Sequence, residues 1–229
     1  MFMKECKTIQ KVIFILAVIC VSITQSWADS WKEIFFADPT IFVENGKYYL
    51  TGTRNREPQG FAILESTDLK HWTVPNGKDL QLILRKGDQA FGEKGFWAPQ
   101  YFKDKRTYYF TYTANEQTVI ASSKSVFGPF RQKEVKPIDA SAKNIDSFLF
   151  KDDDGKYYLY HVRFNKGNYL WVAEFDIKKG SIKPETLKQC MDCTEPWEKT
   201  PNYKSAPVME GPTVMKWDGV YYLFYSANH

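Results

Sequence analysis

The stretch Gly46-Lys47-Tyr48-Tyr49-Leu50 returns three more times along the chain with the same aromatic pair at its centre. The other copies are Arg106-Thr107-Tyr108-Tyr109-Phe110, Gly155-Lys156-Tyr157-Tyr158-Leu159 and Gly219-Val220-Tyr221-Tyr222-Leu223. Successive aromatic pairs start 60, 49 and 64 residues apart. These spacings are near the ~40–50 residues of familiar propeller repeats, with extra loop length. The repeat therefore predicts a β-propeller in which each copy marks one blade.

Short alternating runs of Tyr, Phe, Val and Thr surround each copy and are separated by Gly, Asn and Asp, a pattern typical of β-strands. Three of the four pairs follow a dipeptide suited to a tight hairpin turn, namely Asn45-Gly46, Asp154-Gly155 and Asp218-Gly219. Outer strands are expected over 62–66 and 118–122. The sequence thus predicts an all-β fold built from four-stranded antiparallel blades.

Carboxylates occupy similar places in three of the repeats. In a propeller the first strand of every blade lies at the central axis, so equivalent positions face one another. Counting back ten or eleven residues from the four aromatic pairs gives Asp38, Ala98, Asp146 and Glu210, where we expect the blades to begin. A single acid there could be a strand-end group held by an ion pair or a cap. Three acids at equivalent positions instead predict one shared acidic site.

The expected acid cluster suits one kind of chemistry. Carboxylates in a shared pocket oppose one another's ionisation, so at least one should keep its proton near neutral pH. Glycoside hydrolysis needs a carboxylic acid to protonate the leaving oxygen, and a second carboxylate that attacks as a nucleophile or deprotonates water. Glu210 has the longest reach of the three and is the candidate proton donor.

Four short motifs resemble those of glycoside hydrolase family 43. They are Asp38-Pro39-Thr40, Phe96-Trp97-Ala98-Pro99, Ile145-Asp146-Ser147 and Glu210-Gly211-Pro212, and the similarity extends over residues 33–229. The resemblance implies a five-bladed β-propeller, with about four blades in this chain, and an inverting glycosidase that hydrolyses O-glycosyl compounds. It makes Asp38 the general base, Glu210 the general acid, and Asp146 the residue that orients Glu210 and tunes its proton affinity. Inversion requires about 6.5–9.5 Å between base and acid.

The resemblance implies an oligo- or polysaccharide substrate and leaves its sugar open. We expect removal of terminal α-L-arabinofuranose or β-D-xylose from plant-type polysaccharides. Galactan or galactofuranoside hydrolysis, and glycan binding without catalysis, are the alternatives. The candidate substrate-binding residues are Trp97, Phe96, Phe148 and His161. Trp97 could stack on a sugar face, although a core tryptophan and a packed histidine are the competing interpretations. No cofactor or metal ligand is assigned.

Residues 1–28 have the features of a signal peptide. Lys4, Lys7 and Lys11 precede an apolar run over 12–23, and Ser26-Trp27-Ala28 supplies the small residues of a cleavage site. The apolar run is shorter than the roughly 20 residues that span a bilayer. We expect a secreted or periplasmic monomer, cleaved after Ala28, with no membrane span and a catalytic domain over residues 29–229.

Composition and the C-terminus add three further expectations. The formal net charge is +4, and +2 without residues 1–28, so no nucleic-acid partner is predicted and Lys178-Lys179 stands as an isolated basic pair. Cys190 and Cys193 predict a short loop disulfide rather than a metal or redox site. Because the family continues through a fifth blade after the fourth repeat, we expect the domain to be C-terminally incomplete.

Overall fold

The computed structural model describes residues 34–77, 79–199 and 206–227. The predicted signal peptide and its cleavage site lie outside these ranges. The described residues form strands β1 to β15 and three single-turn 3-10 helices, at Pro75–Gly77, Pro184–Thr186 and Pro196–Glu198. None of the helices in this part of the chain is long and apolar enough to cross a membrane.

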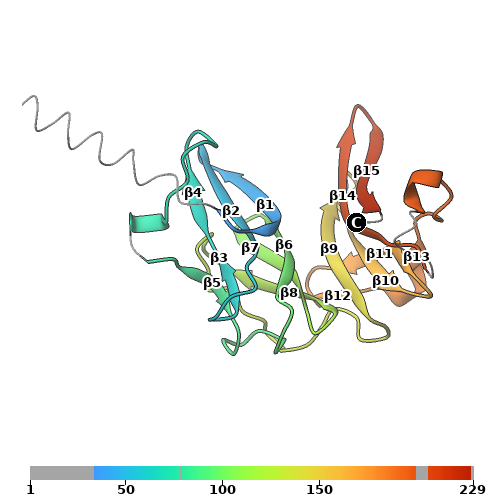
Figure 1. Ribbon diagram of the computed structural model, residues 1–229, viewed down its shortest axis with the longest axis horizontal. Coiled ribbons are helices and arrows are strands. Elements are labelled where there is room, and N and C mark those ends of the chain that lie inside the picture. Colours follow the sequence, from blue (N-terminus) through green and yellow to red (C-terminus); the bar gives the residue numbers. More distant parts are fainter. Residues whose placement is uncertain (1–33, 78, 200–205, 228–229) are drawn as a thin grey trace, which may run out of the picture.

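The described residues form five antiparallel sheets, and the four that begin with β1, β6, β9 and β14 follow one another in chain order (Figure 1). The first contains β1 (Ala37–Glu44), β2 (Lys47–Thr53) and β4 (Leu64–Ser66), and β3 (Gly60–Ala62) pairs beside it with β5 (Leu82–Arg85). The second contains β6 (Trp97–Asp104), β7 (Thr107–Ala114) and β8 (Gln117–Ser123). The third contains β9 (Asn144–Lys151), β10 (Tyr157–Phe164), β11 (Asn168–Asp176), β12 (Ser181–Ile182) and β13 (Lys188–Gln189). The fourth contains β14 (Met209–Trp217) and β15 (Val220–Ala227).

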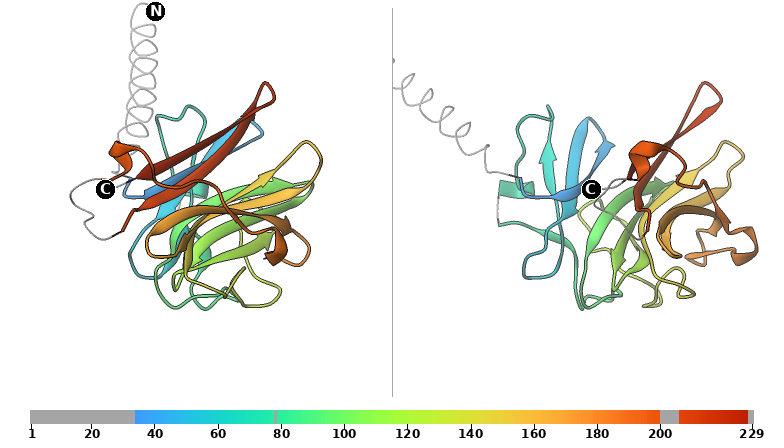
Figure 2. Two further views of the ribbon diagram at one scale, coloured as in Figure 1. Left: turned by 90° about the vertical axis from the view of Figure 1, so that its right-hand side faces the viewer. Right: turned by 45° about the vertical axis from the view of Figure 1, so that its right-hand side comes forward.

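The sheets are arranged as the blades of a propeller. Their first strands lie next to one another in the order β1, β6, β9 and β14, and the sheets fan out from them (Figures 1 and 2). The predicted β-propeller and its four blade starts are therefore confirmed. The outer strand expected over 62–66 is divided at Ile63, because β3 pairs with β5 whereas β4 pairs with β2.

A bulge interrupts each first strand near its beginning. In β1 the pairing with β2 passes from Ala37–Thr53 to Thr40–Thr51, so Asp38 and Pro39 lie opposite one residue. The same shift occurs after Trp97 in β6, Ile145 in β9 and Glu210 in β14. The residue after each of these shifts has a positive φ, namely Asp38 (46°), Ala98 (44°), Asp146 (52°) and Gly211 (60°). A bulge re-aims the side chain it carries.

Apolar clusters fill the interfaces between successive sheets. The first two sheets enclose an aromatic cluster in which Phe110 lies between Phe61 and Phe130, with ring centroids 5.1 Å apart on each side. Leu149, Leu159 and neighbouring residues form a second cluster, and Val162 and Met209 belong to a third between the third and fourth sheets. The alternating side chains of each strand thus serve two interfaces, as expected of central blades.

Two buried amide side chains join the second sheet to the third. Gln100 accepts a hydrogen bond from the Leu149 N–H (2.7 Å) and donates one to the Leu149 carbonyl (3.1 Å). Asn144, which is fully buried, accepts hydrogen bonds from the Thr118 N–H (2.9 Å) and hydroxyl (2.5 Å). Its amide group donates to the carbonyls of Asp139 and Ala142. These bonds fix the register between neighbouring blades, because each satisfies backbone groups that water does not reach.

The outward faces of the first and fourth sheets carry exposed apolar side chains. On β1 these are Ile41 and Val43, and on the fourth sheet they include Trp217, Val220 and Phe224. Trp217 is 66% exposed. These exposed faces are therefore apolar, like the strand faces that are buried between neighbouring blades.

The two cysteines predicted to form a loop disulfide are both free thiols in the structure. Cys193 is buried, and its thiol donates to the carbonyl of Glu198 at 3.3 Å. Burial raises the pKa of Cys190 to about 11. Both side chains pack into the apolar cluster between the third and fourth sheets. They act there as small hydrophobic residues, which corrects the expected disulfide.

The Asn144 amide network gives a testable stability prediction. Replacing Asn144 with Ala leaves the buried Thr118 N–H without its acceptor, so we expect the free energy of unfolding to fall by about 2–4 kcal/mol. Urea unfolding followed by tryptophan fluorescence measures this loss. The matched control is Asn165→Ala in the exposed turn after β10, which should change stability by less than about 0.5 kcal/mol. Equal effects of the two substitutions would contradict the conclusion that the hydrogen bonds of Asn144 stabilise the contact between the second and third sheets.

Candidate active site

A cavity of about 390 Å³ lies where the bulged starts of the four first strands meet. Each first strand contributes its bulge, and β15 contributes Ser226. The lining residues are Asp38, Pro39, Thr40, Ala98, Pro99, Gln100, Asp146, Ser147, Phe148, Gly211, Pro212, Thr213 and Ser226. The size suits a small ligand. Two of the three predicted acids, Asp38 and Asp146, therefore share one cavity.

Asp38 is exposed and is held by one hydroxyl group. The Thr53 side chain, which is buried at the end of β2, donates to the Asp38 carboxylate at 2.6 Å. The same hydroxyl oxygen accepts a hydrogen bond from the Ala98 N–H at 2.9 Å. Thr53 thus connects the carboxylate of the first blade to the backbone of the second. Because a hydroxyl has one hydrogen and Ala98 already supplies a donor, that hydrogen is available to Asp38.

Asp146 is in a more buried environment. Its N–H donates to the Thr113 hydroxyl at 3.0 Å, and its carboxylate accepts the Gly211 N–H at 3.2 Å. Burial and then the negative charge of Glu210 raise the pKa of Asp146 to about 7, with a smaller contribution from Asp38 and a partial offset by the Gly211 hydrogen bond. Asp146 is therefore the acid that burial keeps protonated close to neutral pH.

Glu210 does not occupy the repeat position that counting back from the fourth aromatic pair predicts. The bulge and the positive φ of the fourth blade fall on Gly211, so Gly211 is the equivalent of Asp38, Ala98 and Asp146. Glu210 is one residue earlier, at the position of Ala37, Trp97 and Ile145. Only two of the four equivalent positions carry acids. Glu210 does not line the cavity, although its charge reaches Asp146.

The partner that holds Glu210 was not predicted from the sequence. Asn168 begins β11, where its N–H donates to the Pro207 carbonyl at 2.9 Å and it bridges to Val208 in parallel. Its side-chain amide donates to the Glu210 carboxylate at 2.6 Å. This bond orients Glu210 from the third blade. No motif marks Asn168 in the sequence, because it lies in an ordinary hairpin between β10 and β11.

The candidate substrate-binding residues divide into three groups. Phe148 lines the cavity. Trp97 is half-buried outside it, and its indole N–H donates to Asn55 at 3.2 Å. Phe96 and His161 are buried in the protein interior and do not line the cavity. Phe96 stacks on Tyr112 at 5.8 Å in the first aromatic cluster. We therefore assign Phe96 and His161 to the core rather than to the binding surface.

His161 has an unusual environment for a core residue. Burial, followed by the charge of Arg163, lowers its pKa to about 4, so the ring is neutral. Its Nε2 atom has no hydrogen-bond partner among the described residues. His161 lies opposite the bulge that carries Asp146 and Ser147. Within the same residues, no group of three or more His, Cys, Asp or Glu side chains is arranged to hold a metal ion.

The four sheets and the acidic cavity at their first strands define a β-propeller with a carboxylate site. The chain belongs to Glycosyl hydrolases family 43, whose sequence profile matches residues 32–229. In structure it resembles an endo-1,4-beta-xylanase from Bacteroides thetaiotaomicron, with a TM-score of 0.75, 42% sequence identity, and coverage of 85% of this chain and 64% of that one. This similarity supports the predicted five-bladed fold class.

Two relatives show how much of a whole protein the chain represents. It is 28% identical over 204 residues to a xylosidase/arabinosidase from Butyrivibrio fibrisolvens, covering 84% of this chain and 37% of that protein. It is also 28% identical over 203 residues to an extracellular endo-alpha-(1->5)-L-arabinanase from Bacillus subtilis, covering 83% and 59%. The chain therefore spans less than two thirds of the length of these relatives.

The raised pKa of Asp146 predicts a pH-dependent effect on stability. An aspartate in the unfolded chain has a pKa near 3.9, so ionising Asp146 is harder in the folded state. Folding is consequently penalised as pH rises from about 4, and the penalty levels off above about 7. The Asp146→Asn variant cannot ionise. Its melting temperature relative to the wild type should therefore increase by at least about 2 °C between pH 5 and pH 8.

Differential scanning calorimetry of both proteins at the two pH values measures this increase. The control is Asp88→Asn, which removes an exposed carboxylate in the turn after β5. Its melting temperature relative to the wild type should stay constant across the same interval. If the difference is constant for Asp146→Asn as well, folding does not raise the pKa of Asp146.

Proposed function

We propose that the protein is an inverting glycosidase that hydrolyses O-glycosyl bonds, with Asp38 as general base and Glu210 as general acid. The observation that supports this most is the pairing of two different acid environments at one cavity. Asp38 is exposed and hydrogen-bonded to Thr53, whereas Asp146 is half-buried, and its pKa is raised first by burial and then by the nearby charge of Glu210. The exposed Asp38 is suited to accept a proton from water, and Asp146, whose charge is coupled to that of Glu210, is suited to modulate the neighbouring proton donor. Membership of family 43 supports the same chemistry.

Hydrolysis would proceed by a single displacement. The Asp38 carboxylate removes a proton from water, the water oxygen bonds to the anomeric carbon, and the glycosidic carbon–oxygen bond breaks. The departing oxygen takes a proton from Glu210. For this step the proton that the coupled Asp146 and Glu210 pair retains resides on Glu210, and Asp146 accepts the Gly211 N–H and so fixes the strand that carries Glu210. The Asn168 side-chain amide donates to the Glu210 carboxylate and orients it.

The proposed substrates carry terminal α-L-arabinofuranose or β-D-xylose. The similar proteins support a pentose, since they include a xylosidase/arabinosidase, an arabinanase and a xylanase. These names cover both chain-end and internal cleavage. We favour action at chain ends, and galactofuranosides and galactans are the competing substrates. Comparing nitrophenyl arabinofuranoside, xyloside and galactofuranoside with arabinan and xylan decides among them, and binding without turnover on any would favour a lectin.

We also propose export through the signal peptide predicted over residues 1–28. The support is the sequence pattern itself and the word extracellular in the name of the arabinanase relative. An N-terminus at Asp29 in the secreted protein, found by mass spectrometry, would agree with this proposal.

The acid and base roles predict different responses to substitution. Asp38→Asn should lower turnover about 10²–10⁴-fold on every substrate, because nothing then deprotonates the attacking water. Glu210→Gln should lose a similar factor on arabinan or xylan, but less than about tenfold on nitrophenyl glycosides, whose leaving group departs without a proton. Initial rates on both substrate types, with product anomers followed by NMR, measure the split.

The control for these variants is Glu185→Gln, which removes an exposed carboxylate near β12 and should leave both rates unchanged. Equal losses on both substrate types in Glu210→Gln would reject the proton-donor role. Rescue of Asp38→Asn by azide with retained configuration would make Asp38 a nucleophile and reject inversion.

A further inference from the structure

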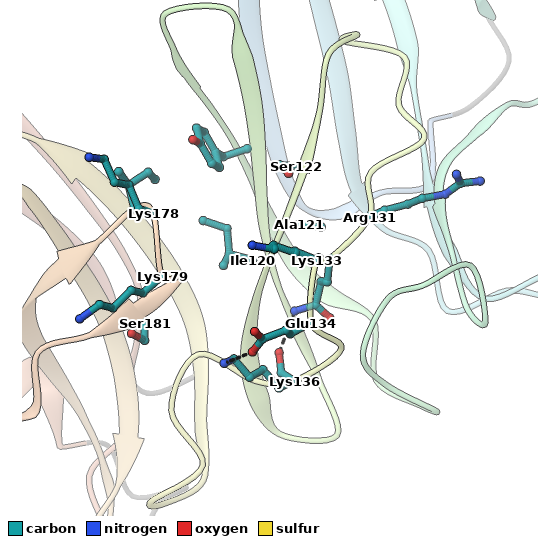
Figure 3. A pocket seen from close by; sticks show the side chains of 14 residues that line it. Ile120, Ala121, Ser122, Arg131, Lys133, Glu134, Lys136, Lys178, Lys179 and Ser181 are labelled. Carbon is teal, nitrogen blue, oxygen red and sulfur yellow. Dashed lines mark hydrogen bonds and ion pairs between the residues drawn. The ribbon is translucent and has the colours of Figure 1, made fainter.

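A second cleft, of about 420 Å³, lies on the outside of the molecule between the second and third sheets (Figure 3). It shares no lining residue with the acidic cavity. One wall is β8 with the loop that follows it, and the other is the turn between β11 and β12. Figure 3 shows Lys133 and Lys136 on the first wall and Lys178 and Lys179 on the second. The Lys133 side chain extends toward the second wall, whereas those of Arg131, Lys178 and Lys179 extend outward from the cleft.

The charge of this cleft is strongly one-sided. Its one acidic lining residue, Glu134, pairs with Lys136 at 2.5 Å. Among the described residues, no carboxylate lies within ion-pair distance of Lys133 or Lys178. The sequence suggested that Lys178-Lys179 is an isolated basic pair, but the fold places it across from Lys133. Asp176, at the edge of the second wall, lies 3.9 Å from the Lys179 ammonium, so Lys133 and Lys178 give the cleft its excess positive charge in a chain whose overall charge is small.

Both walls have a fixed backbone. Asp176 accepts hydrogen bonds from the N–H groups of Lys178 and Lys179, each at 3.0 Å, and so shapes the turn. On the other wall Gln132 is buried, where it accepts from the Phe91 N–H (2.7 Å) and donates to the Lys136 carbonyl (2.7 Å). Because these hydrogen bonds already fix the backbone of both walls, binding a ligand would have to order only side chains, which limits the entropy cost of binding.

The remaining lining favours a sugar over a small inorganic anion. Tyr109, Ile120 and Ile177 provide apolar surface, and Ser122 and Ser181 provide hydroxyl groups. Sugars combine apolar faces with hydroxyl edges, and the anionic group common among polysaccharide sugars is the uronate carboxylate. We propose that this cleft binds uronate units of an acidic polysaccharide. The proposal rests on the proposed function only for the polysaccharide, since the positive charge alone indicates an anion.

Isothermal titration of the full chain with trigalacturonate tests the proposal. Binding should be measurable at about 0.05 M salt and weaker at about 0.5 M. Lys133→Gln combined with Lys178→Gln should weaken it about two- to thirty-fold, as expected for two exposed charge contacts. Lys188→Gln removes an exposed lysine outside the cleft and should leave binding unchanged. Neutral galactotriose should not bind at the cleft.

Several outcomes would overturn the uronate site. They are an absence of binding at low salt, equal losses in the double variant and in Lys188→Gln, full displacement by an equal concentration of phosphate, or tighter binding of a single-stranded oligonucleotide. Turnover of nitrophenyl pentosides by the same variants separates the two proposals. Normal turnover without trigalacturonate binding rejects only the cleft, and binding without turnover rejects only the catalytic assignment.

A second inference concerns Thr53, and it rests on the proposed role of Asp38. Two threonines occupy the same register position in the second strands of their blades, and each accepts an N–H from the next blade, Ala98 for Thr53 and Asp146 for Thr113. Only Thr53 also donates to a carboxylate. The third blade has Val162 in the same register, so the fold does not depend on a hydroxyl at this position. We infer that Thr53 is a positioning residue that aims the Asp38 carboxylate at the attacking water.

Thr53→Val keeps the shape of the side chain and removes the hydroxyl. Turnover number should fall about ten- to a hundredfold with KM little changed, because the base is misaligned while the substrate still binds. Thr53→Ser should restore most of the activity. The matched control is Thr51→Val, which removes a buried hydroxyl that has no hydrogen-bond partner among the described residues and should leave activity intact.

Three results would reject this role while the wild type remains active. They are an unchanged turnover number in Thr53→Val, a change confined to KM, or failure of Thr53→Ser to recover activity. If Thr53→Val loses activity together with its melting transition, the Thr53→Ser comparison decides between packing and positioning. An inactive wild type would instead reject the catalytic proposal itself.

Discussion

The bulge at the start of each first strand is the constraint on which the site depends. It places a left-handed residue at Asp38, Ala98, Asp146 and Gly211. That conformation is costly for residues other than glycine, so it persists only where the surroundings hold it. Here the neighbouring blade does so, because the freed N–H of one blade finds an acceptor on the previous one. The same hydrogen bonds that pack the blades also direct the two aspartates into one cavity.

The aromatic repeat was sufficient to predict the blades, because strand alternation and hairpin turns are local properties of sequence. It could not give the register of the fourth blade. The turn between β9 and β10 spans 152–156, whereas those after β1 and β14 contain two residues, so a fixed count from the aromatic pairs does not apply to every blade. With the short turn of the fourth blade, the equivalent position is Gly211, ten residues before Tyr221. A motif match still finds Glu210, but repeat geometry does not.

Other site features depended on contacts between distant residues. Asn168 reaches Glu210 across 42 positions in sequence, and Lys133 lies across a cleft from Lys178 only because two blades meet there. Phe96 and His161 carry plausible chemistry in sequence but are enclosed by neighbouring blades. The sequence carries one further signal: Thr53, Thr113 and Ser226 all follow their aromatic pairs at the same spacing, and their hydroxyl groups mark the inner end of the second strand in three of the four blades.

The third blade shows why the two aspartates differ. Val162 replaces the hydroxyl that Thr53 and Thr113 offer, so the N–H of Gly211 has no such acceptor and bonds to the Asp146 carboxylate instead. Asp146 is thereby drawn between two blades, where burial and the charge of Glu210 favour its protonated form. Asp38 has a hydroxyl partner and stays exposed. A single change from a hydroxyl to an apolar side chain in the repeat therefore accounts for the different environments of the two aspartates at equivalent positions.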